Sequence, residues 1–215
     1  MNTNVQVSAT ADAVKTYGRA KETAYQLGKA LKEIKRDVER SYVGIDNAAV
    51  AGNSSTAREL ASVTQQIASG NTKDAGSNST DALTEAKILE THQAVYTAGG
   101  DPTMFMIKPA DSTIVAGFTA ASGRNRTFND QTTQLTAVVD ILVNPFGTLN
   151  VVLNRHQLST HAFLLDPTMW RTCNLRPFSR TLLSKTGDSD KHFVVGELTL
   201  KHMNFSADGM ITGLS

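Results

Sequence analysis

Apolar residues recur every three or four positions over residues 10–43 of the chain. This spacing predicts one amphipathic helix from about Thr10 to Val43. Thr10 or Asp12 is suited to cap its start, and Gly44 is suited to end it. Such a helix would be about 50 Å long, whereas a compact globule formed by this chain would have a diameter of roughly 45 Å. We therefore expect an elongated subunit that rests on neighbouring molecules.

The apolar face of this helix is expected to pack against the sheet that the last strands of the chain form. The residues assigned to that contact are Leu27, Leu31, Ile34 and Val38. If Leu31 is buried there, Leu31→Ala should cost about 2 to 5 kcal/mol. The other faces of the helix carry mostly lysine, arginine and glutamate, which is typical of a solvated surface.

The rest of the chain predicts two shorter helices followed mainly by strands. One helix begins at Thr80 or Asp81 and stops at Gly99-Gly100, and the other spans about Ala110 to Ala121, with a cap at Asp111 or Ser112. Runs of branched and aromatic residues between turn signals predict the strands, and the proline and glycine within residues 144–147 predict a hairpin turn. The strands lie at residues 104–108, 135–143, 148–153, 161–165, 180–184, 193–203 and 210–214. The fold class is α+β, with one long helix against sheets.

Composition excludes several classes of protein. The 21 basic and 20 acidic residues leave a formal net charge of +1, so no obligate DNA or membrane partner is implied. The single cysteine, Cys173, cannot form an internal disulfide. No apolar run approaches the roughly 20 residues that a membrane-spanning helix needs, and residues 1–10 do not resemble a secretory signal.

The sequence offers no constellation for catalysis, a cofactor or a metal. The only close pair of histidines is His156 and His161, which lacks a third ligand at metal spacing, so we interpret the five histidines as polar surface residues. Cys173 is interpreted as a small buried apolar residue rather than a nucleophile. The glycines form neither a P-loop nor a dinucleotide fingerprint. We therefore expect a protein that is not an enzyme and needs no cofactor.

Three basic segments leave a second reading open. The long helix has a basic face, residues 122–126 hold two arginines in a polar loop, and Arg171 to Arg180 alternate arginine with apolar residues. Solvation, interface pairing and packing at a domain junction explain them best. A non-enzymatic nucleic-acid-associated protein that uses the basic helix face remains the alternative, and salt-dependent DNA binding would favour it.

Two stretches carry a resemblance to a known family. One is the run VVDILVNPFGT at residues 138–148, continued by VVLNR at 151–155. The other is FLLDPTMW at 163–170, followed by LRPF at 175–178, KTGD at 185–188 and VGELTL at 195–200. In this order they resemble the carboxy-terminal half of the tailed-bacteriophage major capsid proteins with the Hong Kong 97-like (HK97-like) fold. The helix around residues 25–37 resembles the long spine helix of that family.

The resemblance implies a division into a peripheral and an axial domain. Residues 1–78, with the spine helix, and residues 160–215, with the final strands, would form the peripheral domain. Residues 79–159 would form the inserted axial domain. The amino-terminal arm and extended loop that family members place before the spine helix have no counterpart here. The resemblance therefore implies a subunit that, as written, stays monomeric or forms loose rings.

The resemblance also implies the partners and the place of action. Copies of the chain would form pentamers and hexamers of an icosahedral shell, assembled in the bacterial cytoplasm and contacting the enclosed DNA without reading its sequence. Other capsid, scaffold or portal proteins are further expected partners, and no membrane is involved. Candidate ring-contact loops are residues 122–130, with Arg124, Asn125 and Arg126, and residues 144–148.

Overall fold

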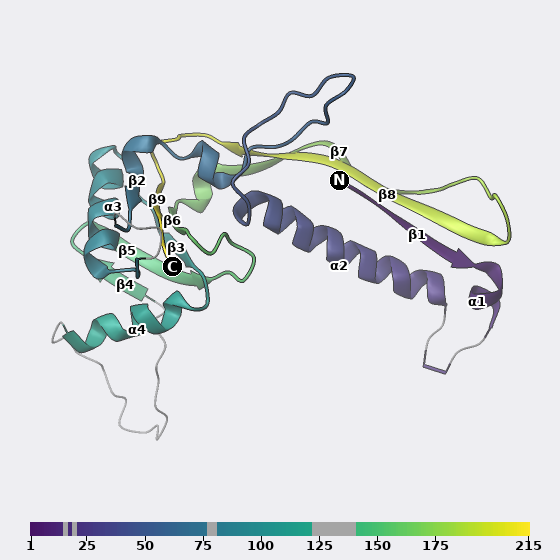
Figure 1. Cartoon of the computed structure of the whole chain (residues 1–215), viewed down its shortest axis with the longest axis horizontal. Helices are drawn as coiled ribbons and strands as arrows, with labels where there is room; N and C mark the ends of the chain where they lie inside the picture. The colour runs from purple at the N-terminus through teal and green to yellow at the C-terminus, as the bar shows by residue number, and fades with distance from the viewer. Residues whose placement is uncertain (15–16, 19–20, 77–80, 122–140) are drawn as a thin grey trace.

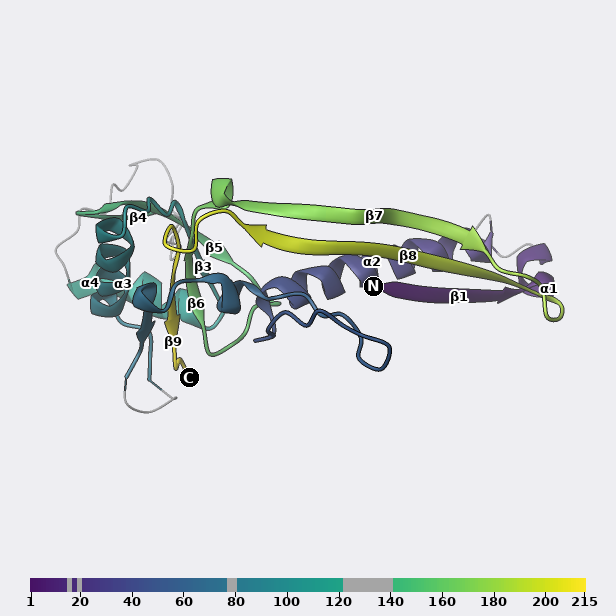
Figure 2. The same ribbon diagram turned by 90° about the horizontal axis from the view of Figure 1, so that it is seen from above.

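The computed structural model describes residues 1–14, 17–18, 21–76, 81–121 and 141–215. The molecule consists of a compact unit built on a six-stranded sheet and a long arm built on a three-stranded sheet (Figure 1). A view from above shows the same arrangement, with the arm extending far beyond the compact unit (Figure 2). The elongated shape expected from the sequence is therefore present.

The arm is formed by strands from the two ends of the chain. The central strand, β8 (Ser189–His202), is antiparallel to both β7 (Trp170–Leu182) and β1 (Asn2–Ser8). Buried and more exposed positions alternate along the first half of β8, as expected for a strand with one covered face. The pattern of residues 193–203 predicted β8, but β1 and most of β7 were not predicted.

The long helix is shorter than predicted and begins later. A short helix, α1 (Ala9–Ala13), is followed by the long helix α2 (Glu22–Val43). Its 22 residues correspond to about 33 Å. Gly18 between the two helices has φ +81°, which is incompatible with a continuous right-handed helix. The prediction of one continuous helix over residues 10–43 is therefore wrong, because the described residues form α1 and α2 with Gly18 between them.

Two residues that were predicted to cap the long helix, Asp12 and Gly44, do contact its ends, although the helix begins later than predicted. Asp12 accepts a hydrogen bond from the Thr23 N–H at 3.0 Å, so it satisfies the first turn of α2 from across the break. This bond lowers the pKa of Asp12 below its ordinary value. Gly44 ends α2 by donating its N–H to the Arg40 carbonyl. A Cβ at Gly44 would collide with the His156 carbonyl, which explains a glycine there.

The helix α2 lies along β1 (Figure 2). Ile34 is buried, and Leu27 and Val38 are half-buried. Leu31, by contrast, is 46% exposed in the single chain. The expectation that Leu31 packs inside the subunit is therefore wrong, because the buried stripe of α2 runs through Ala30 and Ile34 instead.

This difference predicts an order of mutational effects along one helix. Ile34→Ala should lower the free energy of unfolding by about 2 to 5 kcal/mol, because it removes a buried aliphatic side chain. Leu31→Ala should change it by only about 0.5 kcal/mol, which reverses the sequence-based expectation. Urea unfolding of the unassembled subunit measures both, with Lys32→Ala as a surface control. Equal midpoint shifts for the two variants would contradict the observed orientation of α2.

The compact unit is a mixed sheet with helices packed against it (Figure 1). The strand order is β2-β9-β6-β3-β5-β4. The pairs β3/β5 and β2/β9 are parallel and the other neighbours are antiparallel. The strands are β2 (Thr72–Asp74), β3 (Met104–Ile107), β4 (Ile141–Asn144), β5 (Gly147–Leu153), β6 (Ala162–Leu165) and β9 (Gly209–Thr212).

Helices α3 (Glu85–Thr97) and α4 (Asp111–Ala121) belong to this unit. Thr84, rather than the predicted Thr80 or Asp81, caps α3 by accepting a hydrogen bond from the Lys87 N–H. Gly99, with φ +85°, follows its end, as the glycine pair predicted. The described part of the chain also contains three short 3-10 turns, namely η1 (Val63–Gln66), η2 (Ser69–Asn71) and η3 (Pro167–Met169).

Among the described residues, two buried clusters form the core, one on each face of the six-stranded sheet. The larger joins α3 and α4 to the sheet through residues such as Ile88, Val115 and Leu164. The other joins the end of α2 and η1 to the sheet through Val43, Val63 and Phe163. The second cluster therefore anchors the arm helix to the compact unit.

Strand pairing changes the expected domain boundaries. Strands β6 and β9 lie within residues 160–215, which the resemblance assigned to the peripheral domain. Both are hydrogen-bonded into the six-stranded sheet beside β3. A boundary after Ser159 would cut through one continuous sheet. Only β7 and β8 of that segment belong to the arm sheet.

Candidate functional site

The strand β7 presents a long exposed surface. It is the edge strand of the arm sheet, and every residue from Arg171 to Leu182 is exposed. Its exposed apolar side chains include Leu175, at 72%, and Leu182, at 58%. Long edge strands with exposed apolar residues are sites of association with other chains. The expectation that residues 171–180 pack at a domain junction is therefore wrong for the single chain.

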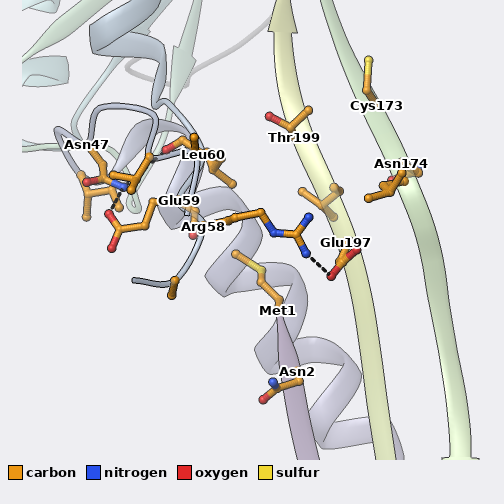
Figure 3. A pocket seen from close by; sticks show the side chains of 17 residues that line it. Met1, Asn2, Asn47, Arg58, Glu59, Leu60, Cys173, Asn174, Glu197 and Thr199 are labelled. Carbon is orange, nitrogen blue, oxygen red and sulfur yellow. Dashed lines mark hydrogen bonds and ion pairs between the residues drawn. The ribbon is translucent and has the colours of Figure 1, made fainter. Parts of the chain in front are cut away.

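An ionic clamp beside this surface consists of Glu197, Arg176 and Arg58. Glu197 on β8 accepts two hydrogen bonds from Arg176 on β7, with the shorter at 2.7 Å. Arg58, from the loop after α2, reaches the same carboxylate at 3.1 Å (Figure 3). The hydrogen bonds from Arg176 hold the pKa of Glu197 below its ordinary value, and the Arg58 charge adds to the effect. The clamp therefore fastens a loop of the chain across the arm sheet.

An open groove of about 890 Å³ lies beside this clamp (Figure 3). Its walls come from the loop after α2, the start of β1, and the middle of β7 and β8. The lining is largely apolar and includes Ile45, Val50, Leu60, Leu175 and Leu198. Cys173 also lines it and is exposed, so the sequence-based interpretation of Cys173 as a buried residue is wrong.

Another exposed strand edge of the described structure lies in the compact unit, at the end away from the arm. Strand β4 is the edge of the six-stranded sheet, and its alternate residues Ile141 and Val143 are 56% and 66% exposed. The turn that joins β4 to β5 is the predicted hairpin over residues 144–147. The side-chain oxygen of Asn144 accepts hydrogen bonds from the N–H groups of Phe146 and Gly147, which fixes this turn.

A buried histidine holds this turn against α3. The Asn144 side-chain amide lies 2.8 Å from Nδ1 of His92, and the rings of His92 and Phe146 are in contact. Because the Asn144 oxygen is already occupied by backbone donors, its amide nitrogen donates to His92 Nδ1. Burial lowers the pKa of His92, so the neutral ring that this bond requires is favoured. The candidate loop over residues 144–148 is thus rigidly placed.

The other predicted ring-contact residues, Arg124, Asn125 and Arg126, lie outside the described residues. The described structure brings the β4–β5 turn and the exposed edge of β4 together at one end of the molecule (Figure 1). The exposed edge of β7 lies on the arm, away from that end. The exposed strand edges at β4 and β7 are therefore separate surfaces of the described structure.

A buried polar cluster stands where the arm meets the compact unit. His202, the last residue of β8, lies 2.5 Å from the Asp208 carboxylate and 2.9 Å from the Gln66 carbonyl. The ring of Trp170, the first residue of β7, stacks on His202 at 3.9 Å. The second Asp208 oxygen accepts a hydrogen bond from the Asp166 N–H at 2.5 Å. Burial raises the pKa of Asp208 to about 6.

This cluster was not predicted, because its members are far apart in the sequence. Gln66 and His202 are separated by 136 positions, and no local pattern links them. The interpretation of all five histidines as surface residues is wrong for His92, His192 and His202, which are buried. Among the residues described, no group of three or more histidine, cysteine or acidic side chains is arranged to hold a metal ion.

No described helix combines the length and the hydropathy that a bilayer-spanning segment requires.

Comparison with known proteins gives a consistent result. The chain is 28% identical to the major capsid protein of Escherichia phage Phieco32, in a match that covers 96% of this chain and 72% of that protein. Among solved structures, it is similar to the capsid subunit of cyanophage A-1(L), with a TM-score of 0.70 and 14% identity over 99% of this chain and 76% of the other.

The fold is also shared by an encapsulin. The holo-SrpI encapsulin complex from Synechococcus elongatus matches with a TM-score of 0.65 and 10% identity, over all of this chain and 73% of that chain. These similarities show that the chain has the Hong Kong 97-like fold. The family model described as SU10 major capsid protein matches residues 1–215, which is the whole sequence. The chain therefore belongs to the SU10 major capsid protein family and is a structural subunit of a phage capsid.

Proposed function

We propose that copies of this chain form rings of five and six that tile an icosahedral shell around phage DNA. The observation that carries this proposal is the separation of two exposed strand edges, β4 on the compact unit and β7 on the arm. A subunit that contacts ring neighbours at one end and other rings at its opposite end needs two such surfaces. Heterologous contacts of this kind close into rings when the rotation between copies allows it.

In this proposal the compact unit supplies the ring contacts. The β4–β5 turn at residues 144–148 is held rigid by His92, and Val143 beside it presents an exposed apolar side chain. The candidate loop with Arg124, Asn125 and Arg126 precedes β4 in the sequence and would add polar contacts. The arm, with the exposed edge of β7, would tie one ring to the next.

The helix α2 is the proposed contact with the enclosed DNA. Lys29, Lys32, Arg36 and Arg40 are exposed and spaced by three or four residues, so they share one face. A basic stripe of this kind attracts phosphates without reading base sequence, and salt weakens the attraction. Scaffold, portal or other capsid proteins would be further partners, and assembly would take place in the host cytoplasm. The chain would act without catalysis.

Two matched variants, observed by electron microscopy of concentrated protein, test whether the compact unit supplies the ring contacts and the arm supplies the contacts between rings. Val143→Asp and Leu182→Asp each place a charge on an exposed aliphatic position, the first beside the β4–β5 turn and the second on the arm. Val143→Asp should abolish rings, whereas Leu182→Asp should leave rings that no longer associate with one another. Unchanged melting temperatures would show that both variants fold. If Val143→Asp leaves the rings intact, the compact unit does not supply the ring contacts.

A further inference from the structure

The turn between β4 and β5 is held by a chain of hydrogen bonds whose direction is fixed. The backbone N–H groups of Phe146 and Gly147 only donate, so the Asn144 atom that they reach, at 3.2 and 3.1 Å, is the side-chain oxygen. The amide nitrogen of Asn144 therefore presents its N–H groups to Nδ1 of His92, at 2.8 Å. Because Nδ1 must accept this hydrogen bond, the ring is neutral and carries its proton on Nε2.

This chain of hydrogen bonds cannot accommodate a second proton on His92. A protonated imidazole donates from both nitrogens, so an Nδ1–H would face the N–H groups of Asn144 across 2.8 Å. Turning the Asn144 amide over would present its oxygen to Nδ1. It would also place the amide N–H groups against the backbone N–H groups of Phe146 and Gly147. Both orientations leave donors facing donors, so protonation separates the turn from α3.

The histidine ring is the fixed partner in this contact, and the turn is the partner that can move. The His92 side chain has no exposed surface, and the Phe146 ring lies 5.8 Å from it between centroids. A buried ring of this kind is held in its rotamer by packing. Pro145, by contrast, is exposed, and Asn144 and Phe146 are only half-buried. The conflict is therefore relieved by movement of the turn.

Two opposing effects act on the protonation of His92. Burial disfavours the charged ring and lowers the pKa of His92 below its ordinary value of 6.5, whereas the charge of Asp101 raises it. Asp101 and the ring border the same glycine, because a Cβ on Gly147 would lie 3.6 Å from Nε2 of His92 and 3.7 Å from Oδ1 of Asp101. Since burial is the larger effect, the ring gains its second proton only as the pH falls below 6.5.

The other described elements around α3 place few charges near this ring. The strands β3, β4, β5 and β9 and the turn η2 carry no ionisable residue. Strand β2, which holds Lys73 and Asp74, is separated from β5 by three strands. The ionisable residues of α3 besides His92 are Glu85, Lys87, Glu90 and Tyr96. Within the described chain, Asp101 is therefore the charged neighbour that acts on His92.

We propose that the β4–β5 turn is an acid-sensitive switch, in which a proton on Nδ1 of His92 releases the turn from α3. The neutral ring holds the turn above pH 6.5, and this contribution is lost as the pH falls through the pKa of His92 in the folded chain. Release of the turn is a property of the single chain. Its consequence rests on the proposed function, in which this turn contacts ring neighbours, so rings should weaken in acid.

Hydrogen exchange at the turn, followed by NMR of dilute unassembled protein, tests the switch. Between about pH 7.5 and about pH 5, the protection factor of the Phe146 amide should fall about tenfold, which corresponds to one net hydrogen bond. The protection factor is corrected for the intrinsic effect of pH on exchange. Protection of Leu149, a buried residue of β5, should stay constant and show that the sheet remains folded. At the higher pH, the ¹⁵N signals of His92 should place its proton on Nε2.

Two substitutions should change this response in different ways. Asn144→Asp supplies a carboxylate, which accepts hydrogen bonds from the Phe146 N–H and from a protonated His92 alike, so protection of the turn should persist in acid. Asp101→Asn removes the charge that favours the protonated ring, so loss of protection should require a lower pH than in wild type. Asp101 is exposed, so this variant should keep the melting temperature of wild type.

Three results would overturn the proposal. These are a Phe146 protection factor that does not change with pH, an equal loss in wild type and Asn144→Asp, and a proton on Nδ1 of His92 at the higher pH. Failure of the proposed function gives a different result, because the turn is monitored in unassembled protein. If the turn responds to acid while the sedimentation of rings does not, the switch stands and the ring contacts lie elsewhere.

Discussion

His202→Ala is expected to lower the free energy of unfolding by about 3 to 5 kcal/mol, because it breaks a buried, paired and stacked group. The substitution leaves the Asp208 carboxyl group and the Gln66 carbonyl without their partner. It also removes the ring that stacks on Trp170. Thermal and urea unfolding of the unassembled subunit measure the loss. Because the cluster joins β7 and β8 to the compact unit, the arm strands should lose protection against hydrogen exchange first.

His202→Phe serves as the matched control. It retains an aromatic ring on Trp170 but cannot bond to Asp208 or Gln66, so it separates the polar contribution from packing. A loss close to that of His202→Ala would assign most of the effect to the hydrogen bonds. A change below about 0.5 kcal/mol in both variants would contradict the role given to the cluster.

The same cluster predicts a pH dependence. The pKa of Asp208 is about 6 in the folded chain, against an ordinary value of 3.8, chiefly because the group is buried. The folded state therefore binds this proton more tightly than the unfolded state does. The contribution of Asp208 to stability is fully present below about pH 4 and is lost as the pH rises through about 6. The free energy of unfolding of wild type minus that of Asp208→Asn should therefore fall as the pH rises from 4 to 7, because only wild type loses this contribution. A constant difference would contradict this assignment.

Phe163→Ala is expected to cost about 3 to 5 kcal/mol. Phe163 on β6 has no exposed surface and packs with Val43 from the end of α2 and with Val63 from η1. Its removal leaves a cavity where the arm helix meets the sheet. Phe205→Ala, at a side chain that is 57% exposed, provides a matched control and should cost much less. Similar midpoints of urea unfolding for the two variants would contradict the position of the core.

The elements that could be predicted from the sequence bury a regular apolar pattern. Helix α4, strand β3 and strand β6 each bury a run of apolar residues or lie between clear end signals, and their predicted bounds agree with the structure within a few residues. The hairpin of β4 and β5 could also be predicted from the sequence, because Pro145 and Gly147 mark its turn. The order of the motifs across the carboxy-terminal half also indicated the family and its fold, through their resemblance to known capsid proteins.

The elements that were missed take their stability from neighbours distant in sequence. Strand β1 buries only Val7, and β7 is exposed from Arg171 onward, so neither shows the apolar pattern of a strand. Both exist because β8 pairs with them on its two sides. The buried pair of His202 and Asp208 likewise depends on tertiary packing. The break before α2 was missed because the apolar spacing continues through Gly18, whereas its φ interrupts the helix.

As a shell subunit, this chain is expected to associate with its own copies. Sedimentation velocity of nuclease-treated protein over a hundredfold concentration range measures this association. Of the monomer and the loose rings that the resemblance allowed, we expect the rings: sedimentation should rise with concentration toward species of five or six copies in the absence of nucleic acid. A single monomeric species at every concentration, or association that appears only when DNA is added and disappears with salt, would contradict it.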